Sequence, residues 1–222
     1  MQDHNVLIFA NGEITDLKRA RALIRMGDFI IAADGGSKYI QKMGMLPDVL
    51  IGDLDSTSRE FIELVTKAGK KIHQYPTAKD TSDLEIAIQY AIALQPQKII
   101  IVGGLGGRVD HLLANVMLLQ RYRNENLVIS MDDGTVEMQL VMGKLAINGA
   151  AGDIVSLIPL SEQVVGIVTE NLEFPLKSET LMIGESRGIS NVMLSDNANV
   201  LINSGVLLCI HTRIGEGEEN GH

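Results

Sequence analysis

Short apolar runs alternate along the first half of the chain with segments in which apolar residues recur every three or four positions. That recurrence is the spacing of a helix with one buried face, and unbroken apolar runs are typical of strands in a sheet covered on both faces. The expected strands are residues 6–10, 29–34, 48–53, 70–76, 98–104 and 126–132, and the expected helices are residues 15–27, 37–44, 57–69, 82–94 and 110–122. This alternation predicts an α/β domain with a mostly parallel sheet and helices on both faces.

The helical spacing stops after about Asp133, and short strand-like segments separated by turn-forming residues follow. These segments are residues 144–147, 153–160, 164–169, 181–185, 191–196, 199–203 and 206–211. Such a series predicts an all-β domain, either a sandwich or a small barrel. We therefore expect an α/β domain over residues 1–134, an all-β domain over 135–214 and a disordered, glutamate- and glycine-rich tail over 215–222.

Polar residues gather where four consecutive predicted strands end. The four ends read Asp34-Gly35-Gly36, Asp53-Leu54-Asp55-Ser56, Lys79-Asp80-Thr81-Ser82-Asp83 and Gly103-Gly104-Leu105-Gly106-Gly107-Arg108-Val109-Asp110-His111. Ligands of open α/β sheets bind in a crevice at the carboxyl ends of the strands. We therefore expect acids from separate strands to meet at one site.

Asp53 and Asp55 are two residues apart. If the strand geometry persists, their side chains point to the same side, with Cα atoms about 6.5 Å apart. Two bare carboxylates at that distance repel each other by about 3 kcal/mol at an effective dielectric constant of about 20. A bound divalent cation with oxygen ligands turns this repulsion into attraction. The pattern therefore predicts a Mg²⁺ site that in turn holds phosphate groups.

The glycine-rich segment 103–107 precedes a predicted helix, where backbone N–H groups can approach anionic oxygens. Arg108 adds a planar donor for two hydrogen bonds to a phosphate. The segment is not a G-x-G-x-x-G fingerprint, because Val109 stands at the third glycine position, and the chain has no G-x-x-x-x-G-K-[ST] sequence. His111 and Asn115 share one face of the helix, and His111 is too isolated from other His or Cys residues for a zinc site.

Each of these polar residues also has a structural interpretation at a helix end. Asp55 or Thr57 can cap the helix that follows, and Ser82 with Glu85 has the spacing of a capping box. Such caps explain residues singly. They do not explain why acids recur at four strand ends.

Composition and charge exclude several functions. The formal net charge of −9 argues against a nucleic-acid partner, since that binding needs a basic surface. No segment has the roughly 18 to 20 uninterrupted apolar residues of a membrane span, and residues 1–13 lack the pattern of a signal peptide, so we expect no membrane contact and a cytoplasmic protein. The single cysteine, Cys209, excludes an internal disulfide, and its apolar neighbours predict a small core residue.

Four segments occur in a specific combination: "ADGG" at 33–36, "PDVLIGDLDS" at 47–56, "KDTSDLE" at 79–85 and "GGLGGRVDHLLAN" at 103–115. In this order and spacing they resemble the thiamine pyrophosphokinase family, and the Asp110–His111 pair resembles its bacterial form. The second half resembles the family more weakly, through "RGISN" at 187–191, which is similar to a Gly-x-Ser-Asn motif of the family's second domain.

The resemblance implies transfer of pyrophosphate from ATP to the hydroxyl of thiamine, with Mg²⁺ and with release of AMP. It implies that residues 1–134 form the nucleotide-binding catalytic domain and that residues 135–214 form a β-sandwich for substrate binding and dimerisation. It also implies a homodimer with thiamine sites between subunits. Carried over by position, the metal ligands are Asp53, Asp55 and Asp80, which with Asp83 and Arg108 make up the catalytic residues. The nucleotide side comprises Asp34, Gly35, Gly36, Ser56, Lys79, Gly104, Gly107, Arg108, Asp110, His111 and Asn115, and the thiamine side comprises Asp83, Asp110, Ser190 and Asn191.

Two features of the implied site stay open. Either Asp80 or Asp83 can accept the hydroxyl proton. Some relatives stack an aromatic side chain on thiamine, a Trp in the animal enzymes, but this chain has no Trp and no aromatic residue near 188–191 in the sequence. Which side chain covers the substrate ring is therefore undetermined.

Three other functions fit part of the pattern. "VLIGDLDST" imitates the Asp-x-Asp signature of phosphatases with an aspartyl nucleophile, in which Asp53 would be phosphorylated. In that enzyme the acids Asp34, Asp80 and Asp110 would have no shared role. A pyrophosphokinase for another alcohol, such as a pterin, and a non-catalytic nucleotide-binding module are compatible with the same cleft.

Overall fold

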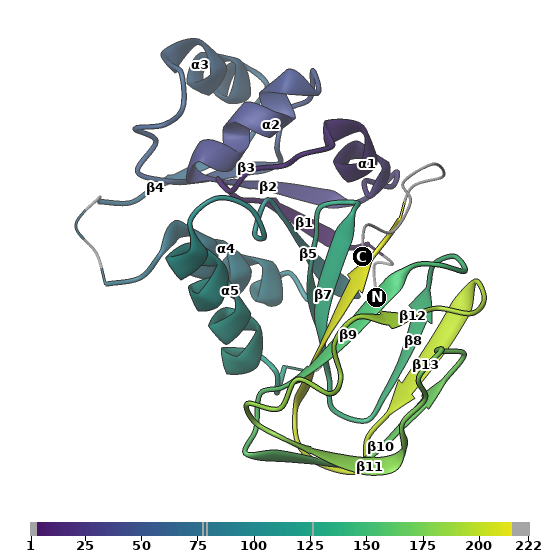
Figure 1. The fold of residues 1–222 in the computed structure, drawn as a ribbon. Helices are drawn as coiled ribbons and strands as arrows, with labels where there is room; N and C mark the ends of the chain where they lie inside the picture. Colours follow the sequence, from purple (N-terminus) through teal and green to yellow (C-terminus); the bar gives the residue numbers. More distant parts are fainter. Residues whose placement is uncertain (1–3, 77, 79, 126, 215–222) are drawn as a thin grey trace. The chain divides into compact units, whose positions relative to one another are not determined.

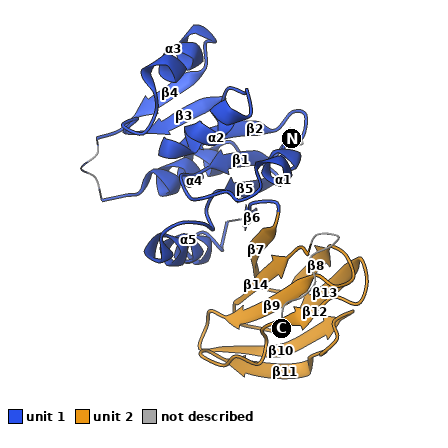
Figure 2. Cartoon of the chain, turned by 45° about the horizontal axis from the view of Figure 1, so that its top comes forward, with its two compact units in different colours: residues 1–134 blue, residues 135–222 orange. Residues whose placement is uncertain are grey.

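The computed structural model describes residues 4–76, 78, 80–125 and 127–214 (Figure 1). The chain divides into two compact units, residues 1–134 and 135–222 (Figure 2). The expected disordered tail, 215–222, lies outside the described residues. None of the helices in the described part is long and apolar enough to cross a membrane.

Six strands of the first unit form a parallel sheet in the order β6-β5-β1-β2-β3-β4. They are β1 (Val6–Phe9), β2 (Phe29–Ala33), β3 (Val49–Gly52), β4 (Lys71–Gln74), β5 (Lys98–Val102) and β6 (Val128–Asp132). Every residue of β1 and β3 is buried, as their unbroken apolar sequences predict. The edge strand β4 is polar and partly exposed.

Helices cover both faces of this sheet, which confirms the predicted fold class. They are α1 (Leu17–Ala22), α2 (Ser37–Lys42), α3 (Arg59–Lys67), α4 (Asp83–Ala93) and α5 (Val109–Arg121), and a 3₁₀ turn, η1 (Asp34–Gly36), joins β2 to α2. One core cluster joins Ala20, Ile40 and Phe61 from the first three helices to side chains such as Phe9 and Leu50 on the sheet. Helix α4 contacts β1, β2, β3 and β5 from the other side (Figure 1).

The strand order creates a switch point beside β1. From β1 the chain builds outward through β2 and β3 to β4, then returns to place β5 on the other side of β1. The connections leaving β1 and β5 therefore diverge, and ligands of open α/β sheets bind in such a crevice.

The second unit is a sandwich of two antiparallel sheets, in the orders β12-β9-β14-β7 and β11-β10-β13-β8. Its strands are β7 (Val136–Val141), β8 (Lys144–Asn148), β9 (Ile154–Pro159), β10 (Gln163–Glu170), β11 (Lys177–Met182), β12 (Asn191–Val192), β13 (Asn197–Leu201) and β14 (Leu207–Thr212). Both sheets contribute to one core, for example Val155 and Cys209 from the first and Ile167 and Val200 from the second. The predicted all-β sandwich is confirmed.

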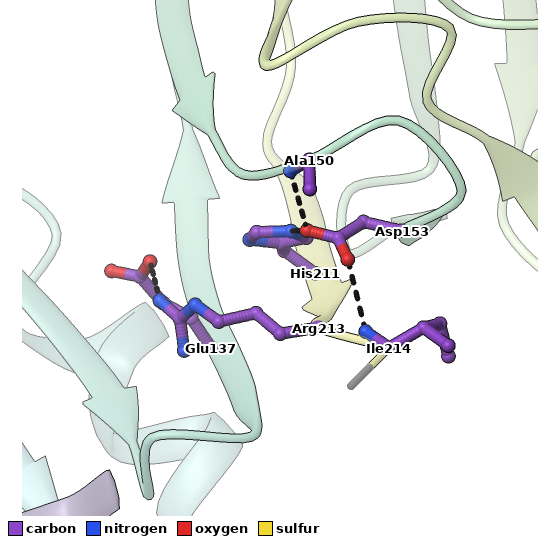
Figure 3. Close-up of polar contacts among 6 residues, drawn as sticks. All are labelled: Glu137, Ala150, Asp153, His211, Arg213 and Ile214. Carbon is purple, nitrogen blue, oxygen red and sulfur yellow. Dashed lines mark hydrogen bonds and ion pairs between the residues drawn. The ribbon is translucent and has the colours of Figure 1, made fainter. Parts of the chain in front are cut away.

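A buried polar cluster ties the end of β14 to the turn before β9 (Figure 3). Asp153 accepts hydrogen bonds from the backbone N–H groups of Ala150 (3.0 Å) and Ile214 (2.9 Å). The same carboxylate lies 2.8 Å from Nε2 of His211, and both side chains are only 3% exposed.

Four elements of the structure differ from what the sequence predicts. Strand β11 spans Lys177–Met182, whereas the predicted strand is 181–185. Helix α1 spans Leu17–Ala22 and is shorter than the predicted 15–27. Strand β7 was not predicted, although its sequence VEMQLV alternates apolar and polar residues as a strand covered on one face does. Strand β12 has two residues, not the six predicted over 191–196.

Candidate active site

A cleft of about 650 Å³ lies at the switch point, at the carboxyl ends of β1, β2 and β5. Six residues predicted for the site line it: Asp34, Asp83, Gly107, Arg108, His111 and Asn115. The cleft also has a wall that the sequence analysis missed, formed by Asn11, Gly12 and Glu13 after β1. The Asn-Gly pair that directly follows the first apolar run was the available signal.

Three acids from two strand ends converge. One carboxylate oxygen from each of Asp34, Asp53 and Asp55 lies within 4.8 Å of the other two. The described residue Asp80 is not part of this group, so its role as a metal ligand stays a prediction, and Asp34, assigned to the nucleotide side, takes the third position. Lys79 lies outside the described residues.

The pair Asp53 and Asp55 is arranged by a turn, because strand β3 ends at Gly52 and the extended geometry does not persist. Leu54 adopts a left-handed conformation with φ of 69° and buries its side chain in the core. The backbone N–H of Asp55 donates to Oδ1 of Asp53 at 3.2 Å, and Ser56 Oγ donates to Asp55 Oδ1 at 3.0 Å. The buried Leu54, in an uncommon backbone conformation, therefore fixes the positions of the two acids.

Asp34 also has a left-handed backbone, with φ of 45°. The glycines after it allow close packing, since a Cβ on Gly36 would collide with the Phe9 carbonyl and one on Gly35 with the Asn11 side chain. Burial raises the pKa of the Asp34 carboxyl, and the charges of Asp53, Asp83 and Asp55 raise it further, against a backbone hydrogen bond from Gly35 that lowers it. Its Oδ1 atom is buried and has no hydrogen-bond partner among the described residues.

This donor set fits a hard divalent cation. Buried polar atoms in proteins are nearly always partnered, so the lone Oδ1 of Asp34 needs an explanation. Three carboxylates within 4.8 Å repel each other unless a cation lies between them. All the donors are oxygens, as Mg²⁺ and Ca²⁺ prefer.

The glycine-rich loop after β5 packs directly against the loop after β1. The N–H of Gly12 donates to the Gly103 carbonyl at 2.9 Å, and a Cβ on Gly12 would lie 2.7 Å from the Gly106 carbonyl oxygen. Asn115 donates from Nδ2 to the Gly104 carbonyl at 2.8 Å, so it supports the loop. The glycines of the two loops therefore let their backbones pack closely and form one floor of the cleft.

Arg108 occupies the N-cap position of α5 and forms an ion pair with Asp110. Nε and Nη2 of Arg108 donate to the two oxygens of the carboxylate at 3.1 and 2.5 Å. The hydrogen bond to Arg108 holds the pKa of Asp110 below its usual value, and a second one comes from the backbone N–H of His111. Both side chains of the pair are exposed, so the guanidinium remains accessible to a ligand.

The structure shows which of the candidate cap residues do cap a helix. Ser82 caps α4 and accepts from the Glu85 N–H at 3.2 Å, as its spacing predicts. Ser58 caps α3, so neither Asp55 nor Thr57 does. Thr57 bonds the Ser37 hydroxyl at 2.8 Å instead. With the capping role excluded, Asp55 has the acid cluster as its remaining interpretation.

In the second unit, Asn191 is buried and bonded to the backbone of Phe174. Its Oδ1 accepts from the Phe174 N–H at 3.0 Å and its Nδ2 donates to the Phe174 carbonyl at 2.7 Å. Phe174 is 66% exposed. An aromatic residue, Phe174, therefore lies beside the "RGISN" segment although it is 17 residues away from Asn191 in the sequence. In that segment Ser190 is exposed, with φ of 57°, and a Cβ on Gly188 would collide with the Leu157 carbonyl.

Two family models match the chain, one for each unit. Residues 20–131 match "Thiamin pyrophosphokinase, catalytic domain", and residues 144–207 match "Thiamin pyrophosphokinase, vitamin B1 binding domain". Together these ranges span most of the chain.

Individual proteins agree with the family models. Thiamine pyrophosphokinase of Bacillus subtilis is 29% identical over 184 residues, which cover 82% of this chain and 86% of the relative. A 6-hydroxymethyl-7,8-dihydropterin pyrophosphokinase of Pyrococcus furiosus is 31% identical over 94 residues, but these cover only 39% of this chain and 40% of the relative. The crystal structure of the Bacillus subtilis thiamine pyrophosphokinase superposes with a TM-score of 0.84 and 25% identity, covering 94% of this chain and 99% of the other. The chain therefore belongs to the thiamine pyrophosphokinase family.

Proposed function

We propose that the protein transfers pyrophosphate from ATP to the hydroxyl of thiamine and releases AMP. The observation that carries this proposal is the convergence of Asp34, Asp53 and Asp55 beside a cleft floored by two glycine-containing loops. Membership of the family supports thiamine as the acceptor, since both the catalytic and the vitamin-binding models match.

Asp34, Asp53 and Asp55 would hold Mg²⁺ through carboxylate oxygens. When bound, the ion supplies positive charge that neutralises the polyphosphate. The fit rests on the three converging oxygens and on the unpartnered Oδ1 of Asp34.

The chain's own groups provide the remaining stabilisation. The guanidinium of Arg108, oriented by Asp110, donates to oxygens of the transferred group, where negative charge grows during transfer. The N-terminus of the 13-residue helix α5 adds its positive dipole end to the same side. Asp83 lines the cleft and Asp80 does not, so Asp83 is the better placed of the two to accept the hydroxyl proton. Phosphoryl-type transfer depends mainly on such positioning.

We further propose that Phe174 covers the thiamine ring. Thiamine carries a cationic thiazolium, and an exposed aromatic face attracts such a cation by about 0.5 to 2 kcal/mol. Replacing Phe174 by Ala should raise the KM for thiamine roughly 3- to 30-fold while the KM for ATP stays unchanged. Phe174→Tyr keeps a ring and should stay near wild type. An unchanged thiamine KM in Phe174→Ala would remove Phe174 from the substrate site.

An assay for AMP release from ATP with Mg²⁺ tests the reaction. We expect AMP to form with thiamine, and not with 6-hydroxymethyl-7,8-dihydropterin, the substrate named for the short-matching relative. Inorganic phosphate without AMP would favour the phosphatase, AMP with the pterin alone would favour the other transferase, and binding of both substrates without products would favour a non-catalytic module.

Asp53→Asn tests the acid cluster. Loss of one charge should lower kcat at least about 100-fold with the fold intact. Glu63→Gln is the matched control, since Glu63 is an exposed acid on the neighbouring helix α3 whose side chain is 68% exposed. Near-normal turnover in Asp53→Asn would exclude Asp53 from the site.

The homodimer and the cytoplasmic location stay proposals. They rest on the family resemblance, and sedimentation equilibrium and fractionation of cells test them.

A further inference from the structure

Lys38 is a cation of the cleft that the sequence analysis did not select. It lies on α2, and its side chain lines the cleft together with Arg108. Its Nζ donates to the Asn11 backbone carbonyl at 3.1 Å and to Asn11 Oδ1 at 2.7 Å. The ammonium also lies 4.7 Å from the centre of the Tyr39 ring. A flexible side chain is therefore held in one place at the cleft wall.

The loop that holds Lys38 is itself fixed on both sides. Toward β5, the N–H groups of Ala10 and Gly12 donate to the carbonyls of Val102 and Gly103 at 2.8 and 2.9 Å. Toward α2, the Tyr39 hydroxyl donates to the Gly12 carbonyl at 2.7 Å and lies 3.3 Å from the Ile14 N–H, which donates to it. Hydrogen bonds on both sides therefore fix the loop that carries Asn11 at the switch point.

The charge of Lys38 is not cancelled by a bonded acid. Both oxygens that it contacts belong to Asn11 and are neutral, whereas Arg108 is bonded to the carboxylate of Asp110. An ammonium group has three N–H donors, and two of them are used by Asn11. Among the described residues of the cleft, Lys38 thus presents a fixed positive charge with one donor left for a ligand.

We propose that Lys38 binds the polyphosphate of the nucleotide and that Asn11 positions its ammonium. A compact ammonium is a common partner of phosphate oxygens, and a polyphosphate next to Asp34 and Asp83 needs cations to balance both sets of charge. The inference rests on the proposed function in that it takes the cleft as the ATP site. It adds a phosphate ligand on α2, held by Asn11 of the wall after β1, and neither of these elements had an assigned site residue.

Direct binding of a non-hydrolysable ATP analogue with Mg²⁺ tests the proposal by calorimetry. Lys38→Met should lower the affinity for the analogue about tenfold or more, because a hydrogen bond to a charged group is lost. The affinity for adenosine should change less than about twofold. Asn11→Ala removes only one of the two oxygens, so we expect a smaller loss for the same ligand.

Lys42→Met is the matched control. Lys42 lies one turn further along α2 and 5.8 Å from the centre of the same Tyr39 ring, but it does not line the cleft. Lys42→Met should leave the affinity for the analogue unchanged. The melting temperatures of Lys42→Met and Lys38→Met should be similar. Equal weakening of analogue and adenosine in Lys38→Met, or analogue affinity equal to wild type, would overturn the proposal, since Lys38 would then only brace the loop.

The binding assay separates this inference from the proposed reaction. Wild-type protein that binds the analogue through Lys38 but forms no AMP from ATP and thiamine would overturn the reaction and support the phosphate contact. Turnover of thiamine with undiminished analogue binding in Lys38→Met would overturn the contact and keep the reaction. Absence of analogue binding in the wild type would overturn both.

Discussion

At Asp34, stability and metal binding oppose each other. Because burial and neighbouring acids raise its pKa, the folded protein keeps this proton to higher pH than the unfolded chain does. Asp34 therefore contributes stability below its ordinary pKa of 3.8, and this contribution is lost as the pH rises through the raised folded pKa. Above that raised pKa and without a metal ion, repulsion within the acid cluster weakens the fold.

Asp34→Asn should therefore raise the melting temperature at pH 7 in metal-free buffer by about 2 °C or more. The decrease in melting temperature from pH 4 to pH 7 should also be smaller in the variant than in the wild type. The same change should abolish the stabilisation that MgCl₂ gives the wild type, because a ligand that binds the native state stabilises it. Thermal unfolding with EDTA or with MgCl₂ measures both effects. Equal stabilisation of wild type and variant by MgCl₂ would place the ion elsewhere.

Cys209 shows how burial decides reactivity. Its side chain is in the core of the sandwich, as its apolar neighbours predicted, and desolvation raises the pKa of the thiol to about 12. Only the thiolate is nucleophilic. We expect no reaction with a thiol reagent such as DTNB in the native protein and full reaction in denaturant, and rapid native labelling would contradict this packing.

Sequence distance decided which site residues could be predicted. Asp34, Asp53 and Asp55 each follow an apolar run, so the rule that ligands bind at strand ends was enough to select them. Phe174 and Asn191 are 17 residues apart, and Asn11 and Lys38 are 27 apart. Such pairs form only when the strands assemble, and neither local spacing nor composition records the assembly.

At the scale of elements, the His211–Asp153 contact is a buried polar link between β14 and the turn before β9 (Figure 3). Asp153→Ala would leave the buried His211 side chain and the part-buried N–H groups of Ala150 and Ile214 without their acceptor. Breaking a buried pair in this way should lower the free energy of unfolding by about 3 kcal/mol.

Glu179→Gln is the control for Asp153→Ala, because the side chains of Glu179 and Arg187 are 31% and 61% exposed, against 3% for Asp153 and His211. An exposed pair contributes less than about 1 kcal/mol. Urea unfolding of both variants measures the difference. Equal, small losses would mean that the buried cluster does not stabilise β14.

The elements that were predicted and those that were missed differ in burial. Strands such as β1 and β3 are buried on both faces, so their sequences are unbroken apolar runs that stand out. Strand β7 is only partly buried over most of its length, so its sequence alternates apolar and polar residues and stands out less. Strand β12 pairs for two residues only, because its extent depends on a partner strand far away in the sequence.

At the scale of the whole molecule, the family resemblance implies a homodimer in which two chains contribute to each thiamine site. A heterodimer of two impaired variants can decide whether the Asp53 and Phe174 of one active site come from the same chain or from different chains. We would co-express Asp53→Asn and Phe174→Ala with different tags, purify the heterodimer, and assay it at low thiamine. If the two residues come from different chains, one of the two sites is intact and about half of the wild-type activity returns. If they come from one chain, both sites are impaired, and activity stays at the level of the two parent homodimers. A protein that sediments only as a monomer would contradict the shared site outright.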